Sequence, residues 1–194
     1  MRFKELKKIK RLEKFAEGYR GVIYIYTEGE KKYAVKVPSE DNLIKAFRKE
    51  AKILKFLNEK GVSFVPKLTF VGEDFLVYEF IEGIPFKKVQ NRIEENKKRY
   101  YLKKILLSAY ILDCFGVFKD EFQRPFTNIL VSGKKVFLLD FERGLLNKKW
   151  KNVPQYLQFL TAVGVIDRQT SIELGKSYKK NPKGVIRKLL KLLS

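Results

Sequence analysis

Four polar side chains of this sequence lie beside apolar residues, at spacings that suit chemistry on a phosphate group or a metal ion. Lys36 follows Ala34 and Val35 on a predicted strand, and Glu50 interrupts the apolar face of the next predicted helix. This helix therefore turns a carboxylate toward the sheet, where Lys36 can pair with it; the alternative is a solvated position at the margin of the helix. Asn128 and Asp140 lie twelve residues apart, before and after a predicted hairpin. An amide and a carboxylate at the same end of two antiparallel strands suit Mg²⁺, which prefers oxygen ligands.

The rare residue types restrict the chemistry further. The chain has no histidine, which excludes a Ser-His-Asp triad and a histidine-ligated metal, so any catalysis must use carboxylates and lysines. The single cysteine, Cys114, excludes a disulfide framework, and its apolar neighbours predict a buried, inert thiol. No apolar run approaches the roughly 18 residues that span a bilayer. The N-terminal segment has no apolar signal core, so we expect a cytoplasmic protein without a transmembrane segment.

The charge of the chain predicts an anionic partner. The 194 residues include 42 Lys and Arg against 22 Asp and Glu, a formal net charge of +20. Basic residues concentrate in residues 2–14, with seven basic and two acidic residues, and in residues 175–194, with seven basic and none acidic. These basic termini favour a polyanion such as RNA. The alternative is the solvated, lysine-rich surface of a thermophilic protein, which the composition also resembles.

The periodicity of the sequence changes from strands to helices along the chain. The first half alternates apolar and polar residues as β-strands do, and its one predicted helix ends before Gly61. Its predicted elements are a strand from Lys14, a turn with Gly18 and Gly21, strands at 22–26 and 33–37, a helix at 41–58, and strands at 67–71 and 75–80.

The second half is mainly helical. Helices are predicted at 97–115, 153–163 and 185–193, around a hairpin of 129–131 and 136–139 that delivers Asp140. We expect the terminal helix to pack its apolar face on the rest of this half. The order of elements predicts an α+β protein with two lobes, residues 1–81 and 82–194.

Residues 15–160 resemble the protein-kinase fold in several motifs. The segment Gly18-Tyr19-Arg20-Gly21 resembles a reduced Gly-rich loop, and Ala34-Val35-Lys36 resembles V-A-I-K. Asp140-Phe141-Glu142 is similar to D-F-G, with a glutamate in place of the glycine. The resemblance implies ATP as cofactor, with Lys36 and Glu50 orienting its phosphates, and Mg²⁺ held by Asn128 and Asp140.

The segment Tyr78-Glu79-Phe80-Ile81 resembles the strand that leads into the kinase hinge. This resemblance implies that Tyr78 lies beside the adenine and that main-chain groups of Glu79 and Ile81 bind it. Gly18 and Gly21 would bring main-chain N–H groups close to the phosphates.

The catalytic loop departs from the kinase pattern. Counting back from Asn128 places Gln123 at the position of the usual aspartate, whereas Lys119-Asp120-Glu121 lies slightly upstream. A family of small archaeal predicted Ser/Thr kinases has H-G-E-L-x-R-P followed by D-F-E. This chain is similar to it at Glu121, Arg124, Pro125 and 140–142, with Lys119 in place of the histidine. The resemblance assigns the catalytic carboxylate to Glu121, with Asp120 as the alternative.

The chain also resembles Rio-type kinases and the kinase of the tRNA threonylcarbamoyl-adenosine complex, because few residues follow Asp140 and no A-P-E motif is present. These resemblances imply an ATP- and Mg²⁺-dependent kinase that acts on a protein or an RNA-associated acceptor. Two other hypotheses stay open. One is a pseudokinase or ATPase-like module whose basic surface binds RNA or a ribonucleoprotein, and the other is transfer to a small-molecule hydroxyl.

Overall fold

The computed structural model describes residues 1–124 and 128–194. Pro125 of the predicted catalytic loop lies outside these residues. The chain forms two compact units, which are described one after the other. Unit 1 comprises Met1–Glu82 together with Asp140–Arg143, and unit 2 comprises Gly83–Leu139 and Gly144–Ser194.

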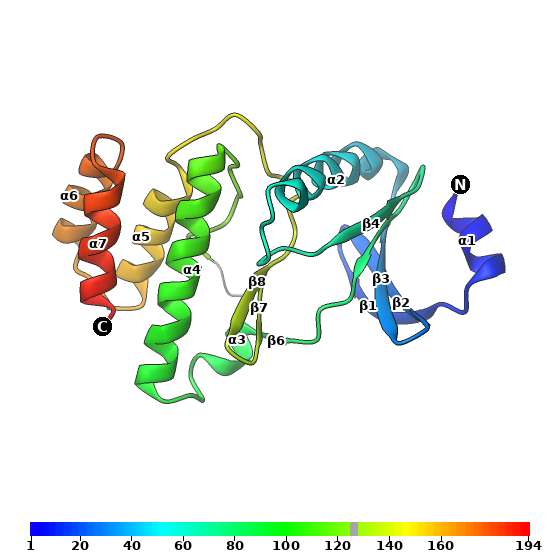
Figure 1. Ribbon diagram of the computed structural model, residues 1–194, viewed down its shortest axis with the longest axis horizontal. Coiled ribbons are helices and arrows are strands. Elements are labelled where there is room, and N and C mark those ends of the chain that lie inside the picture. Colours follow the sequence, from blue (N-terminus) through cyan, green and yellow to red (C-terminus); the bar gives the residue numbers. More distant parts are fainter. Residues whose placement is uncertain (125–127) are drawn as a thin grey trace. The chain divides into compact units, whose positions relative to one another are not determined.

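Unit 1 is an antiparallel sheet with the strand order β1-β2-β3-β5-β4, accompanied by two helices and one short 3-10 helix (Figure 1). Strand β3 lies at the centre of this sheet, and its register with β2 pairs Lys36 with Ile23. The elements are α1 (Phe3–Ile9), β1 (Glu13–Gly18), β2 (Gly21–Glu28), β3 (Lys31–Pro38), η1 (Asp41–Leu43), α2 (Ile44–Glu59), β4 (Leu68–Val71) and β5 (Leu76–Glu79).

Helix α2 packs on the sheet because its apolar residues recur with helical spacing. Phe47 and Ala51 of this helix form a buried cluster with Leu76 of β5. The other face of the sheet is covered by α1, whose Leu6 is buried with Val35 and other apolar residues. Burying the larger of these side chains, such as Phe47 and Leu76, contributes about 1.5–3 kcal/mol each relative to exposure. Helix α1 was not predicted, because Leu6 is its only buried residue and leaves no apolar periodicity to detect.

Unit 2 is mainly helical and includes one small sheet of order β6-β7-β8 (Figure 1). Its elements are β6 (Ile84–Pro85), α3 (Phe86–Val89), α4 (Glu95–Phe115), β7 (Ile129–Ser132), β8 (Lys135–Leu138), α5 (Asn152–Ala162), α6 (Arg168–Tyr178) and α7 (Pro182–Leu192). Helix α4 ends at Gly116, whose left-handed φ of 70° favours glycine. The predicted docking of the terminal helix is confirmed, since Val185, Ile186 and Leu189 are buried.

The α+β class and the five-stranded antiparallel sheet are confirmed, whereas α1 and other details of the prediction were missed or wrong. Helix α6 lies where no helix was predicted, because Leu174 and Tyr178 are its only buried residues. Cys114 is exposed rather than buried. Its neighbours in sequence are apolar, but α4 turns Leu112 and Asp113 inward and leaves the thiol on the outer face.

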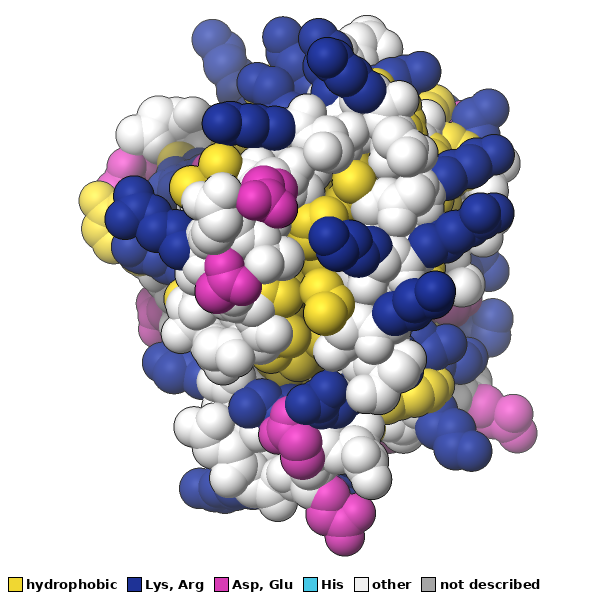
Figure 2. Space-filling view, turned by 90° about the vertical axis from the view of Figure 1, so that its left-hand side faces the viewer, with side chains coloured by type: hydrophobic (Ala, Val, Ile, Leu, Met, Phe, Trp, Pro, Cys, Tyr) yellow, Lys and Arg dark blue, Asp and Glu magenta, His cyan; other side chains and the backbone are white. Residues whose placement is uncertain are grey.

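Among the described residues, no helix combines the length and the apolarity that crossing a membrane requires. Lys and Arg side chains are spread over the face that carries α6 and α7, with few acidic side chains between them (Figure 2).

Candidate functional site

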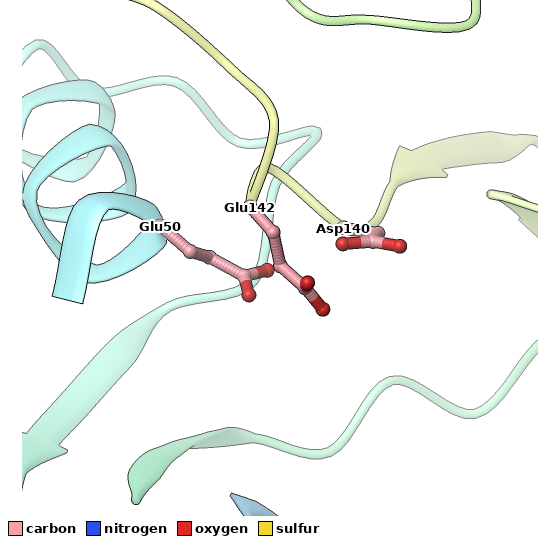
Figure 3. Close-up of side chains that lie close together, drawn as sticks. All are labelled: Glu50, Asp140 and Glu142. Carbon is pink, nitrogen blue, oxygen red and sulfur yellow. The ribbon is translucent and has the colours of Figure 1, made fainter. Parts of the chain in front are cut away.

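The centre of the candidate site is the ammonium group of Lys36, which contacts three carboxylates. Its Nζ lies 2.7 Å from Oε2 of Glu50, 2.8 Å from Oε1 of Glu142 and 3.3 Å from Oδ1 of Asp140. Figure 3 shows the three acidic side chains converging from α2 and from the segment after β8. All four residues belong to unit 1. The predicted pairing of Lys36 with Glu50 is therefore present in the structure.

Local structure explains why Glu50 points inward. It lies on the face of α2 that also buries Phe47, Ala51 and Leu54, and it is only 3% exposed. A buried carboxylate needs polar partners. Its Oε2 accepts a hydrogen bond from Lys36 Nζ, and its Oε1 accepts one from the main-chain N–H of Phe141 at 3.1 Å. Glu50 thus joins α2, β3 and the Asp140–Glu142 segment.

The electrostatics of this cluster keep Lys36 charged. Burial by itself disfavours the ammonium form, but the negative charges of Glu50 and Asp140, and those of further neighbours, outweigh burial and raise the pKa of Lys36 above its ordinary value. Burial raises the pKa of Glu50, and the charge of Lys36 opposes this shift. Burial also raises the pKa of the Tyr78 hydroxyl, which is close enough to Lys36 to be affected by its charge. A lysine whose charged form is favoured in this way is suited to binding an anion.

Glu142 has a second cationic partner, which the sequence did not reveal. Its Oε2 lies 2.5 Å from Nε of Arg20, in the two-residue turn between β1 and β2. Because Oε1 of the same carboxylate contacts Lys36, we call these three residues the Glu142 bridge. Glu142 is 3% exposed and Arg20 is 32% exposed. The bridge ties the turn that resembles a Gly-rich loop to the central lysine.

The turn itself gives its two glycines different roles. A Cβ added to Gly21 would lie 2.5 Å from the main-chain oxygen of Val37, so glycine is required there for close packing of β2 on β3. At Gly18 an added Cβ would meet nothing closer than 3.9 Å, and its backbone needs no left-handed φ. Close packing therefore explains why residue 21 is glycine, but it does not explain the glycine at position 18.

The hinge-like segment at the end of β5 has two main-chain donors already in use. The N–H of Glu79 donates to the carbonyl of Lys67 at 2.9 Å, and the N–H of Phe80 donates to the carbonyl of Lys32 at 2.8 Å. Of the two groups on Glu79, it is the carbonyl rather than the N–H that suits an additional partner. Ile81 follows directly, outside any strand.

The three carboxylates have the donor chemistry of a metal site, since one oxygen of each lies within 4.8 Å of the others. However, the ammonium of Lys36 is in contact with all three, so it already supplies the positive charge at their centre. The carboxylate suited to an additional cation is that of Asp140, whose side chain is 39% exposed whereas Glu50 and Glu142 are buried. Asp140 has a φ of 62°, an uncommon backbone conformation for a residue other than glycine. An accessible carboxylate oxygen fits Mg²⁺.

Unit 2 brings together two further predicted residues, Glu121 and Asn128. The side-chain Nδ2 of Asn128 donates a hydrogen bond of 2.9 Å to Oε2 of Glu121. This bond orients the Asn128 amide, and it leaves the oxygen of that amide as the atom that suits a cation. Glu121 has a φ of 72°, so this turn too departs from common backbone conformations. Among the residues that the structure describes, Asp120 forms no corresponding bond with Asn128.

A buried network in unit 2 supports the segment that carries Glu121, and sequence reasoning assigned it no role. Asn152, at the start of α5, accepts a hydrogen bond from the N–H of Lys119 at 2.8 Å and donates one to the carbonyl of Val117 at 2.7 Å. The fully buried Asp113 accepts bonds from the N–H and the side-chain amide of Asn152 and from the hydroxyl of Tyr178. These hydrogen bonds hold the main chain of residues 117–119 in place, immediately before the candidate catalytic loop.

Comparison with known proteins identifies the family. The sequence profile of the RIO domain matches residues 5–158. The chain belongs to the RIO domain family. The predicted resemblance to Rio-type kinases is thus confirmed.

A solved structure with a similar fold is the streptomycin–ATP–APH(2")-IIa ternary complex, with a TM-score of 0.59 and 15% identity, over 96% of this chain and 84% of that chain. At this identity the likeness concerns the fold. A comparison with curated proteins gives no match. The RIO domain and the kinase-like fold together support a phosphotransferase of the atypical kinase class.

Proposed function

We propose that this RIO domain protein transfers the γ-phosphate of ATP to a hydroxyl acceptor in the presence of Mg²⁺, as an atypical Ser/Thr protein kinase. The observation that carries the proposal is the contact of Lys36 with both Glu50 and Asp140. Phosphoryl transfer needs positioned phosphates and neutralised charge more than it needs strong base catalysis. A lysine held in place by one buried carboxylate, beside a second and more exposed carboxylate, meets that need.

In the proposed reaction, unit 1 binds the nucleotide. Lys36 binds the α- and β-phosphates, and Glu50 holds the ammonium group in place. The carbonyl of Glu79 and the N–H of Ile81 bind the adenine, and Gly18 and Gly21 allow main-chain N–H groups to approach the phosphates. Because Gly21 also has a packing role, Gly18 is the more specific test of this last assignment.

Unit 2 supplies Glu121 and Asn128 to the reaction, whereas Asp140 belongs to unit 1. Oxygens of Asn128 and Asp140 would hold Mg²⁺, which neutralises charge on the phosphates when bound. Glu121 accepts a hydrogen bond from the acceptor hydroxyl. As the acceptor oxygen bonds to the γ-phosphorus, the bond from that phosphorus to the bridging oxygen of ADP breaks, and the hydroxyl proton passes to Glu121. This role for Glu121 is supported by its bond to Asn128.

The test is transfer of labelled γ-phosphate to the protein itself and to generic basic and acidic proteins. Because the similar fold of known structure contains streptomycin, the panel of acceptors should include an aminoglycoside. We expect wild type to transfer label in the presence of Mg²⁺, and Asp140→Ala and Lys36→Met to lose transfer while keeping a cooperative thermal unfolding transition. ATP binding without transfer to any acceptor would instead favour a pseudokinase.

A second candidate function, RNA binding by unit 2, is favoured by the surface around α6 and α7. Residues 175–194 include seven basic and no acidic residues. Trp150, Lys149, Lys180 and Lys183 are among the residues that line a pocket of about 370 Å³. Single-stranded nucleic acids bind where aromatic faces and cations occur together. Gel shifts with tRNA at two salt concentrations test this candidate, since release of counterions makes such binding weaken steeply with salt. Absence of binding at low salt would contradict it.

A further inference from the structure

A second cavity lies in unit 1, separate from the Lys36 cluster. It is a groove of about 410 Å³ between α2 and β4. Its apolar part is formed by Ala51, Leu68 and Val71, and α2 contributes three basic residues, Arg48, Lys52 and Lys55. We call it the α2–β4 groove. Exposed apolar surface with a polar rim is typical of binding sites.

The register of β4 explains why its floor is apolar. Leu68 pairs with Tyr78 and Val71 pairs with Leu76, and a bulge lies between Leu68 and Phe70. Because Tyr78 and Leu76 are two residues apart on β5, they share one face of the sheet, and so do their partners Leu68 and Val71. That face is the one covered by α2, since Leu68 packs on the cluster of Phe47, Ala51 and Leu76. Val71 is nevertheless 44% exposed.

The rim carries positive charge that the unit does not neutralise. Arg48, Lys52 and Lys55 follow one another at helical spacings of four and three residues, so they share one side of α2, and all three are exposed. Within residues 1–124 and 128–194, none of them forms an ion pair. Arg48 donates to the main-chain carbonyl of Glu73 at 3.2 Å.

The carboxylate of Glu73, the acidic group that lines the groove, already has two cationic partners. It contacts the ammonium group of Met1 at 3.1 Å and Nε of Arg2 at 3.0 Å. These contacts lower the pKa of Glu73, with the bond from Arg2 as the largest cause. Glu73 is therefore not available to neutralise the rim. The positive charge of the rim favours negatively charged ligands.

The shape of the site favours an extended ligand. Strand β4 is at the end of the sheet order β1-β2-β3-β5-β4, so its outer edge has no strand beside it among the described residues. The main-chain groups at such an edge can bond to an extended peptide, whose side chains alternate between two faces. Because α2 covers the face that carries Leu68 and Val71, the floor and the rim meet the same face of such a peptide, so its apolar and acidic side chains must follow one another at every second position.

We propose that the α2–β4 groove binds an extended segment of a partner protein that presents both apolar and acidic side chains on one face, at every second position. A second copy of this chain is disfavoured because its net charge of +20 repels the rim. Nucleic acid is disfavoured because the floor is aliphatic and offers no aromatic face for stacking. The proposal does not rest on phosphotransfer, since it concerns binding alone.

The experiment measures the fluorescence anisotropy of the labelled octapeptide Ile-Ser-Asp-Ser-Ile-Ser-Asp-Ser, added to the protein. When extended, this peptide has isoleucine and aspartate on one face and serine on the other. Two further probes are octa-aspartate, which has the charge without the apolar side chains, and an eight-nucleotide oligouridine. The test variants are Lys52→Glu/Lys55→Glu at the rim and Val71→Asn at the floor. The matched control is Lys188→Glu/Lys191→Glu, an equal change of charge on exposed positions of α7. Thermal unfolding confirms that each variant is folded.

We expect the octapeptide with isoleucine and aspartate on one face to bind at least about tenfold more tightly than octa-aspartate. The rim variant should weaken its binding about tenfold or more, because two ion pairs are replaced by repulsion, and the control variant should change it less than about twofold. Val71→Asn should weaken the peptide about threefold or more without affecting octa-aspartate. Equal affinity for the peptide and octa-aspartate, equal effects of the rim and control variants, or competition by oligouridine at the rim would each overturn the proposal.

Discussion

The Glu142 bridge leads to a specific prediction for the affinity of the protein for ATP. The carboxylate of Glu142 contacts both Lys36, at 2.8 Å, and Arg20, at 2.5 Å. In the proposed function these cations lie where the phosphates bind, so a nucleotide must compete with a carboxylate of the protein itself. We therefore expect Glu142→Gln, which keeps the shape of the side chain but removes its charge, to bind ATP more tightly than wild type.

The size of the effect follows from the two contacts. A hydrogen bond to a charged group contributes about 1.5–3 kcal/mol. Lys36 keeps Glu50 and Asp140 as partners in the variant, so the competition concerns mainly the bond to Arg20. Because Arg20 is 32% exposed, solvent reduces this contribution, and about 1–2 kcal/mol is expected. This free energy corresponds to an ATP affinity roughly 5- to 30-fold higher.

The assay is isothermal titration calorimetry of wild type and Glu142→Gln with ATP and with adenosine. Adenosine is the control because it has the base and the ribose but no phosphates, so its affinity should not change. Glu28→Gln is the matched variant, since it also removes one negative side-chain charge of unit 1 that is paired with a cation, here Lys10. It should change neither affinity.

Two outcomes are informative in different ways. If Glu142→Gln binds ATP no more tightly than wild type while adenosine is unaffected, the bridge does not compete with phosphates, and the reasoning is refuted. In that case Glu142 would instead help to position Lys36. If wild type binds neither ATP nor adenosine, the proposed function itself is contradicted.

Three further predictions concern unit 2. Glu121→Gln should lower kcat about 100-fold or more, with a smaller effect on ATP affinity, because general base catalysis contributes about this much. Asp120→Asn should change neither quantity. Steady-state kinetics of both variants test this assignment, and impairment of Asp120→Asn alone would show that Asp120 is the catalytic carboxylate instead. Asn152→Ala should lower the free energy of unfolding, measured in urea, by roughly 2–4 kcal/mol, because it leaves buried hydrogen-bond partners of Asn152 unsatisfied. A decrease well below about 1 kcal/mol would contradict a stabilising role of this network. Hydrogen bonds with Thr170 lower the pKa of Asp167, so its contribution to stability is present above the ordinary carboxyl pKa of 3.8 and is lost as the pH falls through the lowered value. The difference in Tm between wild type and Asp167→Ala should therefore shrink from neutral to strongly acidic pH, and a constant difference would disagree with this sign.

Much of unit 1 was predictable from the sequence because its strands and α2 have clear periodicities. Alternating apolar residues identified the strands, and the interruption of the apolar face of α2 by Glu50 predicted its pairing with Lys36. This inference succeeds because strand and helix periods determine which side chains share a face, and the order of elements brings the two faces together.

Elements with few buried residues were not predictable in the same way. Helix α1 buries Leu6 alone, and α6 buries Leu174 and Tyr178. Their helical state depends on packing against the rest of the unit rather than on an apolar pattern. Cys114 shows the converse, since apolar neighbours in sequence suggested burial, whereas the rotation of α4 buries Asp113 and exposes the thiol.

Local patterns along the chain were enough to predict the fold class, the pairing of Lys36 with Glu50 and the excess of positive charge. Each of these follows from local periodicity, residue type or composition. The tertiary structure alone decided that Glu142 joins Arg20, 122 residues away, and that Asn152 supports the segment before Glu121. It also decided that the cations of α2 line an apolar groove. Such contacts depend on how distant segments of one unit pack together, so they cannot be predicted from the spacing of residues along the chain.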